Sequence, residues 1–228
     1  MKKKQTRMPA KERRQAILEA VQVLFAEKGF DGTTSREMAR AAGVSEALLY
    51  KHFPDKDAIY AAIRDSAIND ELVEEYGRIA GLPPSSKTLV LLMQFFIEKI
   101  IERNPRKVDL SRLMVRSMLE DGKFAATFYT TVSAEWMDQF EKSVQAAAKN
   151  GDLEPSPIHT GTLQLLVYSL CSGLRLHLDQ PKIPRRVALS RDELVEQCTW
   201  FTLMGIGLKP SVIRRHYRRD GLKAVLTD

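Results

Sequence analysis

The sequence predicts an all-α protein, and three observations carry this prediction. Apolar residues recur at spacings of three and four along almost the whole chain, as they do on the buried face of a helix. No run of alternating apolar and polar β-branched residues indicates a strand. Glycine, proline and Asn-Gly or Asp-Gly pairs interrupt the helical pattern at intervals that suit helix ends. We therefore expect helices packed on helices in one small and one larger domain.

The first helix is expected to begin near Pro9 and to end at Gly29, because proline suits an early helical position and glycine a helix end. Its buried stripe is expected to contain Ile17, Ala20, Val21, Leu24 and Phe25. Helices are then expected at about 35–42 and 46–52, from Asp55 to Arg78, and at 87–103, 107–119, 123–149, 158–178 and 191–206. No internal repeat interrupts this order.

Charge is distributed unevenly along a chain of ordinary globular composition. Hydrophobic residues make up 44% of it and charged residues 28%, which excludes disordered and fibrous classes. The net charge of +6 is concentrated at the ends: residues 1–14 carry seven Lys and Arg against one Glu, and residues 209–228 carry six against two Asp. These ends are placed either to bind a polyanion or simply to form solvated tails.

Two further features bear on location. No stretch of about 18 uncharged apolar residues occurs, and the basic start runs into an amphipathic pattern rather than the apolar core of a signal peptide. Cys171 and Cys198 lie far apart in apolar helical segments, which indicates buried reduced thiols rather than a disulfide. We expect a cytoplasmic protein without a membrane partner.

The most informative stretch is residues 29–56. Thr34 followed by Glu37 predicts a capping box, in which the hydroxyl and the carboxylate each satisfy a backbone amide at a helix start. Gly43 permits the left-handed backbone that ends this first short helix, and Ser45 can cap the next one. The pattern therefore predicts a helix-turn-helix, two short helices that cross steeply.

The second short helix has an apolar and a polar face. Across the two short helices and the turn between them, the residues expected to point inward are Met38, Ala39, Val44, Leu49 and Phe53. Val44 and Leu49 occupy the two positions of a hydrophobic staple. The outward face offers Ser45, Glu46, Ala47, Tyr50 and Lys51, which are small or hydrogen-bonding groups suited to a major groove. Thr33, Thr34 and Lys56 flank this face where phosphates would run.

The same stretch resembles the N-terminal pattern of the TetR family of regulators. The residues that carry the resemblance are Gly29, Thr33-Thr34, Met38-Ala39, Ala42-Gly43-Val44-Ser45, Leu49-Tyr50, His52-Phe53 and Lys56. The resemblance implies phosphate contacts by Thr34, Tyr50 and Lys56, and base contacts by Arg36, Ser45, Glu46, Ala47 and Lys51. The chain departs from the pattern at Glu46 and Ala47, where many relatives carry a basic residue and then glycine, so the operator cannot be inferred from relatives.

The resemblance also implies a domain organisation. We expect a DNA-binding domain at 8–65, a helical effector-binding and dimerisation domain at 66–208, and a basic C-terminal tail at 209–228. Dimerisation is assigned to the last two long helices, in which apolar faces are combined with small residues that allow close approach, namely Ser169, Gly173, Gly205 and Gly207.

The larger domain carries adaptable and aromatic apolar residues that are typical of a small-molecule pocket between helices, and equally of an ordinary helical core. They are Met93, Phe96, Met114, Met118, Phe128, Trp136 and Tyr168. On this basis we expect a small apolar or amphipathic effector.

The sequence-based hypothesis is a ligand-responsive repressor that binds a pseudo-palindromic operator as a homodimer. An activator of the same fold is an alternative, and so is a helical interaction protein that has lost DNA binding, which Glu46 makes conceivable. No Gly-rich phosphate loop, GxSxG or HExxH motif indicates an enzyme. The four histidines are scattered, so we expect neither a metal nor another cofactor.

Overall fold

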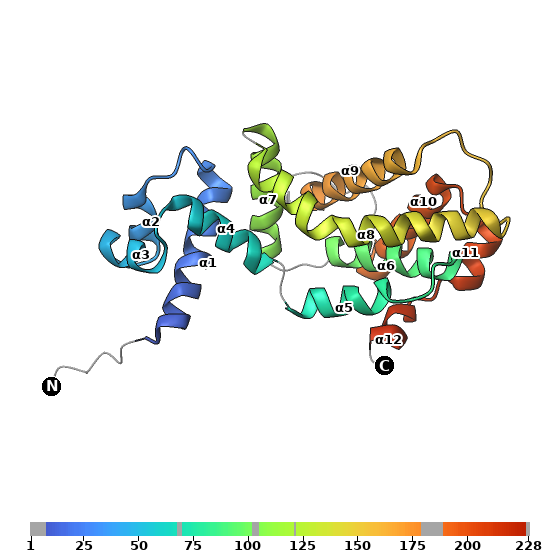
Figure 1. Ribbon diagram of the computed structural model, residues 1–228, viewed down its shortest axis with the longest axis horizontal. Helices are drawn as coiled ribbons and strands as arrows, with labels where there is room; N and C mark the ends of the chain where they lie inside the picture. Colours follow the sequence, from blue (N-terminus) through green and yellow to red (C-terminus); the bar gives the residue numbers. More distant parts are fainter. Residues whose placement is uncertain (1–7, 68–69, 102–104, 121, 179–188, 227–228) are drawn as a thin grey trace. The chain divides into compact units, whose positions relative to one another are not determined.

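The computed structural model describes residues 8–67, 70–101, 105–120, 122–178 and 189–226 (Figure 1). Within these ranges the regular structure is helical, and β structure is limited to one isolated bridge between Leu153 and Leu208. The helices are α1 (Ala10–Lys28), α2 (Ser35–Ala41), α3 (Glu46–His52), α4 (Lys56–Ala67), α5 (Asp70–Ala80), α6 (Ser86–Ile101), α7 (Pro105–Leu119), α8 (Lys123–Lys149), α9 (Thr160–Leu178), α10 (Arg191–Ile206), α11 (Pro210–His216) and α12 (Gly221–Leu226). The all-α prediction is confirmed. None of the helices in these ranges combines the length and apolarity needed to cross a bilayer.

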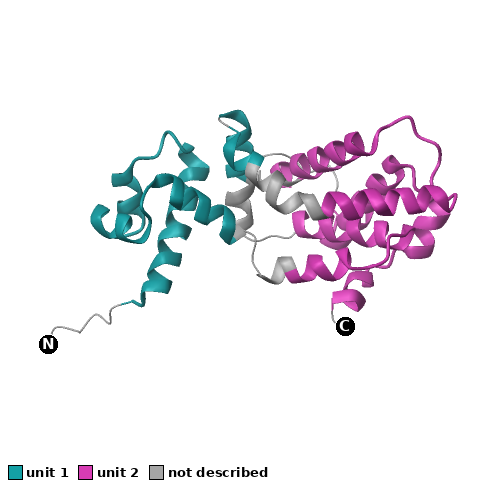
Figure 2. Cartoon of the chain, viewed as in Figure 1, with its two compact units in different colours: residues 1–69, 104–129 teal, residues 70–103, 130–228 magenta. Residues whose placement is uncertain are grey.

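The chain forms two compact units, which Figure 2 shows in different colours. Unit 1 consists of residues 1–69 and 104–129, and unit 2 of residues 70–103 and 130–228. The sequence-based boundary at residue 65 separates α1–α4 from the rest, but it leaves 104–129 with the larger domain. In the structure this segment joins unit 1 because α7 packs along α1.

Unit 1 has its own apolar core. α1 packs against α2, α4 and α7, and the fully enclosed side chains of the core include Ile17, Val21, Phe25, Met38 and Leu49. The other two members of the predicted α1 stripe, Ala20 and Leu24, are half-buried. The spacing of apolar residues in α1 was therefore sufficient to identify its packed face.

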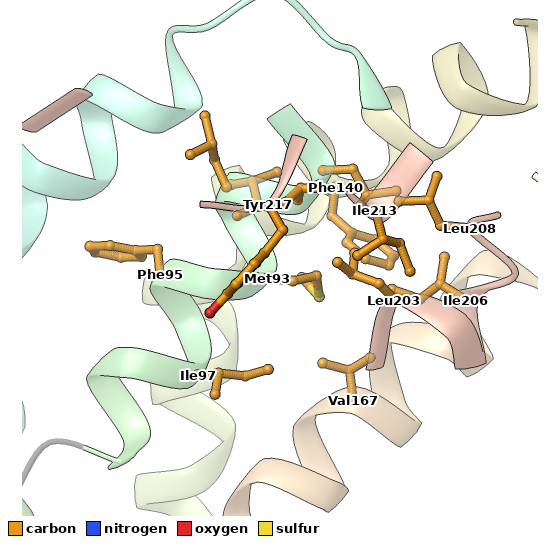
Figure 3. Packing of buried hydrophobic residues seen from close by; sticks show 14 of the residues in the cluster. Met93, Phe95, Ile97, Phe140, Val167, Leu203, Ile206, Leu208, Ile213 and Tyr217 are labelled. Atoms are coloured by element: carbon orange, nitrogen blue, oxygen red, sulfur yellow. The ribbon is translucent and has the colours of Figure 1, made fainter. Parts of the chain in front are cut away.

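Unit 2 is built around α6, which packs against α5, α9, α10, α11 and α12. Residues on all sides of α6 are buried, as expected for a helix without a polar face. Figure 3 shows Met93 of α6 amid Phe140 of α8 and the end of α10 at Leu203 and Ile206. The predicted role of Gly207 changes, because it ends α10 with a φ of 99° and thus serves as a left-handed cap.

The C-terminal segment, expected as a basic tail, instead forms α11 and α12 and belongs to the core of unit 2. Its buried residues are Val212, Ile213, Tyr217 and Leu222. The buried amide of Gln94 on α6 donates from Nε2 to the carbonyl oxygens of Arg218 and Arg219, at 3.1 and 3.3 Å. Two very short helices bury too few residues to produce a clear sequence period, so the charge dominated the sequence-based interpretation.

Parts of several predictions fall outside what the structure describes, including residues 102–103 of the helix expected at 87–103 and residues 227–228 of the expected tail. The helix expected from Asp55 to Arg78 corresponds to α4 and α5, and its continuity at residues 68–69 lies outside the described residues. The same holds for residues 179–188, the proline-containing segment between the helices expected at 158–178 and 191–206, and for the side chain of Phe128.

Candidate nucleic-acid interface

The start of α2 is closed by the predicted capping box. The Glu37 backbone N donates to Thr34 Oγ1 at 3.3 Å, and the backbone N of Thr34 donates to Glu37 Oε2 at 2.9 Å. The Thr34 hydroxyl also donates to Glu37 Oε2 at 2.9 Å. Two otherwise unpaired amides are thereby satisfied, which fixes the point where α2 begins.

Glu37 also ties α2 to the end of α1. Lys28 Nζ lies 2.5 Å from Glu37 Oε1. The hydrogen bond from Lys28, followed by those from Thr34, lowers the pKa of the Glu37 carboxyl from its ordinary 4.5 to about 2. Glu37 is therefore ionised at neutral pH, and its carboxylate connects the start of α2 to the end of α1. We assign it to this structural role rather than to a contact with DNA.

Thr33 requires a correction as a flanking residue. Its side chain is only 2% exposed, and its hydroxyl donates to the carbonyl oxygen of Gly29 at 2.8 Å. This hydroxyl holds the loop after α1 in place and is not available to a phosphate. The hydroxyl proton of Thr34 is likewise donated to Glu37. A capping or loop role and a DNA-contacting role look alike in sequence, because both select a hydroxyl at a helix start.

The turn between α2 and α3 has the predicted form. Gly43 adopts a φ of 63°, in the left-handed region that favours glycine, and Val44 N donates to Ala39 O at 2.9 Å. Ser45 caps α3 by accepting from the backbone N of Leu48 at 3.2 Å. Leu49 is fully buried. The orientation of α3 is thus set by a cap on one side and a packed leucine on the other.

These contacts leave the predicted outward face of α3 exposed. Its exposed residues are Ser45, Glu46, Ala47, Tyr50 and Lys51, and Arg36 of α2 is exposed as well. The Tyr50 hydroxyl contacts the hydroxyl of Ser35, the first residue of α2. Sequence reasoning missed Ser35, because only the fold brings the start of α2 to the middle of α3.

Lys56, the last of the predicted phosphate-contacting residues, begins α4. Its Nζ lies 4.3 Å from the centroid of the Phe30 ring, and its side chain is half-buried. The preceding Asp55 closes the helix start, because its Oδ1 accepts from the backbone N of Ala58 at 2.7 Å. Unit 1 therefore combines an exposed polar helix face with a lysine held at a defined place.

Comparison with known proteins identifies this arrangement. The profile of the family described as bacterial regulatory proteins, tetR family, matches residues 17–63. The HTH-type transcriptional repressor KstR2 of Rhodococcus jostii is 25% identical over 139 residues, which cover 61% of this chain and 67% of KstR2. The helix-turn-helix region of this chain, residues 17–63, is therefore of the TetR type.

Two further TetR-family relatives extend the comparison. The HTH-type transcriptional repressor AcnR of Corynebacterium glutamicum is 38% identical over 68 residues, 29% of this chain and 36% of AcnR. The structure of AibR in complex with isovaleryl coenzyme A and operator DNA has a TM-score of 0.63 at 18% identity, and the match covers 83% of this chain and 97% of AibR. The sequence match thus spans about a third of AcnR, and the likeness to AibR establishes the fold.

The predicted effector pocket is not assembled within one unit. Met114 and Met118 belong to α7 in unit 1, where Met114 is buried and Met118 is 51% exposed. The members in unit 2 are Met93, which is fully buried in the core, and Phe96, Trp136 and Tyr168, which are half-buried. Phe96 and Trp136 stack on each other with centroids 5.0 Å apart. Core packing therefore accounts for Met93 and Met114.

A depression of about 430 Å³ lies on unit 2, but its lining is polar. The residues are Glu193, Glu196, Gln197, Trp200 and Arg219. Glu196 is paired with Arg219 across it, at 2.7 Å. This surface feature lacks the apolar character expected of the predicted pocket.

Proposed function

We propose that this chain is a ligand-responsive transcriptional repressor that binds a pseudo-palindromic operator as a homodimer. The observation that carries the proposal is the exposed polar face of α3, held by the Ser45 cap and by buried Leu49 within the residues that match the family. A rigidly presented helix face of this kind suits the major groove. The repressor reading is supported by KstR2 and AcnR, which are both named repressors.

Within this proposal, Tyr50 and Lys51 have different tasks. Tyr50 presents a hydroxyl beside that of Ser35 and is assigned to a phosphate, where it positions α3 without reading sequence. Lys51 is exposed and charged on the same helix and is assigned to the groove. Arg36, Ser45, Glu46 and Ala47 complete the proposed base-reading surface, and Lys56 is assigned to a phosphate.

The homodimer is supported by an apolar face on α9 and α10. Leu165 and Leu166 on α9 are 58% and 54% exposed, and Phe201 and Met204 on α10 are 66% and 54% exposed. Large apolar side chains exposed on both helices indicate an interaction surface. A second copy of the chain supplies the same face, which a two-fold symmetric interface requires.

A small-molecule effector is part of the proposal because the AibR structure contains both isovaleryl coenzyme A and operator DNA. An effector that binds better to a dimer with mismatched recognition helices lowers DNA affinity by the same factor by which DNA lowers effector affinity. An activator of the same fold would use the same contacts, and the position of the operator in the promoter separates the two.

The test is a salt titration of DNA binding for three variants. Tyr50→Phe should weaken binding to operator and random-sequence duplexes by similar factors. Lys51→Ala should lower the salt slope by about one ion and, where Lys51 touches a base, relax preference at one position per half-site by roughly 1–3 kcal/mol. The matched control is Lys149→Ala, which removes an exposed charge at the end of α8.

A helical protein that has lost DNA binding predicts a different outcome. Tyr50→Phe and Lys51→Ala would then fold and dimerise normally and bind every duplex as the wild type does across the titration. That result would reject the assignment of α3 as a recognition helix.

A further inference from the structure

Lys56 contacts an aromatic ring, and among the described residues it has no ion pair with an acidic side chain. Its Nζ lies 4.3 Å from the centroid of Phe30, where the face of the ring attracts a cation. The ammonium keeps its charge, and its remaining N–H groups can still donate to an acceptor. The ring therefore restricts the motion of the Lys56 side chain without neutralising its charge. This lowers the conformational entropy that the side chain loses when it binds a ligand.

The Phe30 ring is in turn fixed by two neighbours. Its centroid lies 4.9 Å from that of Tyr60 on α4 and 5.8 Å from that of Phe25 on α1. Tyr60 meets Phe25 edge to face, at 5.2 Å and 88°. Phe30 lies in the loop after α1, so these ring contacts, rather than a helix, determine how its face is oriented.

A fourth ring comes from the beginning of α8. Phe124 is 3% exposed, and its centroid lies 5.2 Å from that of Tyr60. The Phe124 backbone N donates to Ser117 Oγ at 3.0 Å, and the Ala125 N donates to the same oxygen at 3.3 Å. The position of Phe124 is thus set by the corner between α7 and α8, which a buried hydroxyl closes.

The α7–α8 corner also contacts the end of α1. Arg116 on α7 donates from Nη1 to the carbonyl oxygen of Glu27 at 2.6 Å and from Nε to Glu120 at 2.7 Å. Both side chains lie against Gly29, where a Cβ would collide with them and where φ is 77°. The α7–α8 corner therefore contacts the surroundings of Phe30 in two ways, through the backbone before it and through Tyr60 next to its ring.

We propose that Phe30, Tyr60 and Phe124 form a ring cluster that positions the Lys56 ammonium for a DNA phosphate, and that the α7–α8 corner tunes DNA affinity through this cluster. The inference rests on the proposed function, because it takes Lys56 to be a phosphate contact. α8 begins in unit 1 and continues into the residues of unit 2. Phe124 lies in the part of α8 that belongs to unit 1.

The first test is a double-mutant cycle on binding to a random-sequence duplex. Phe30→Leu keeps an apolar side chain but removes the ring, and it should weaken binding about two- to fivefold with an unchanged salt slope. Lys56→Gln should lower the salt slope by about one. In the Lys56→Gln background, Phe30→Leu should cause no further loss. An equal loss in both backgrounds would overturn the positioning role.

The second test needs no DNA. The ε-methylene protons of Lys56 should resonate upfield in the NMR spectrum because of the Phe30 ring current, and Phe30→Leu should remove this shift. Phe124→Leu should reduce it. Phe140→Leu, which changes an equally buried phenylalanine in unit 2, should not. Urea unfolding of each variant checks that the fold is retained.

The two tests separate the inference from the proposed function. A Lys56 signal that is insensitive to Phe124→Leu overturns the proposed role of the ring cluster, whatever the protein binds. If the wild-type protein binds no duplex but its Lys56 signal responds to changes at Phe30 and Phe124, the proposed function and the phosphate contact are rejected. The ring cluster is then still supported.

Discussion

Unit 1 and unit 2 differ in how strongly polar contacts define their helices. In unit 1, side-chain caps on α2, α3 and α4 determine where short helices begin, and each cap involves residues close in sequence. In unit 2, Ser190 and Glu193 cap α10 in the same way, but most of the organisation comes from apolar packing around α6. A cap identifies particular positions, whereas an apolar period indicates only that one face of a helix is covered.

The limit of the apolar period is visible when α1 and α10 are compared. Ile17 and Val21 on α1 are fully buried within the chain, whereas Phe201 on α10 is 66% exposed. Both helices carry apolar residues at helical spacing. Sequence predicts a covered face in each case, but only the structure distinguishes a face covered by the same chain from one that the chain leaves exposed.

The largest expected effect follows from that exposed face. Phe201→Glu places a charge at the centre of the proposed dimer interface and should produce a monomer at micromolar concentration in sedimentation or light-scattering measurements. DNA affinity should fall about 100-fold or more, because two linked half-sites are no longer bound together. Gln145→Glu, an equal charge change at an exposed position of α8, should leave the dimer intact. A Phe201→Glu protein that stays dimeric would mean that another surface forms the interface.

The next effect concerns a cap in unit 1. Ser117→Ala leaves the buried amides of Phe124 and Ala125 without their common acceptor and should lower the free energy of unfolding by about 1–3 kcal/mol in urea titrations. Ser211→Ala, at an exposed position of α11 outside the proposed dimer face, should have no measurable effect. Equal stabilities of the two variants would show that the α7–α8 corner does not depend on its hydroxyl.

A smaller effect is expected from acid. The pKa of Glu37 is about 2, below its ordinary 4.5. Its stabilising contribution is therefore complete above pH 4.5 and is lost as the pH falls toward 2. Glu37→Gln should reduce the dependence of Tm on pH in this window. The matched variant in unit 2 is Glu193→Gln, which removes the carboxylate of the capping box at Ser190. The pKa of Glu193 is also lowered. An acid profile unchanged by Glu37→Gln would contradict the ion pair with Lys28.

The smallest effect is expected from the cysteines. Both are free thiols, and burial raises the pKa of Cys171 to about 12 and raises that of Cys198. Mass spectrometry should find Cys171 unalkylated by iodoacetamide at pH 8 in the folded protein and alkylated in urea. A reductant should leave the oligomeric state unchanged. Dissociation on reduction would instead indicate a disulfide between subunits.

The sequence by itself determined the helical class, the capping box at Thr34 and Glu37, the Gly43 turn and the exposed face of α3. These features depend on residues within a few positions of one another, so local hydrogen bonding and helical spacing are enough to define them.

Only the tertiary structure decided which distant segments meet. It brought 104–129 into unit 1, buried Tyr217 and Leu222 of the supposed tail in unit 2, committed the Thr33 hydroxyl to Gly29, and placed Ser35 beside Tyr50. Apolar burial is non-directional, so a helical period does not specify which core receives the face. A hydroxyl has the same chemistry whether its acceptor is a carbonyl of the chain or a phosphate, and only the folded geometry selects between them.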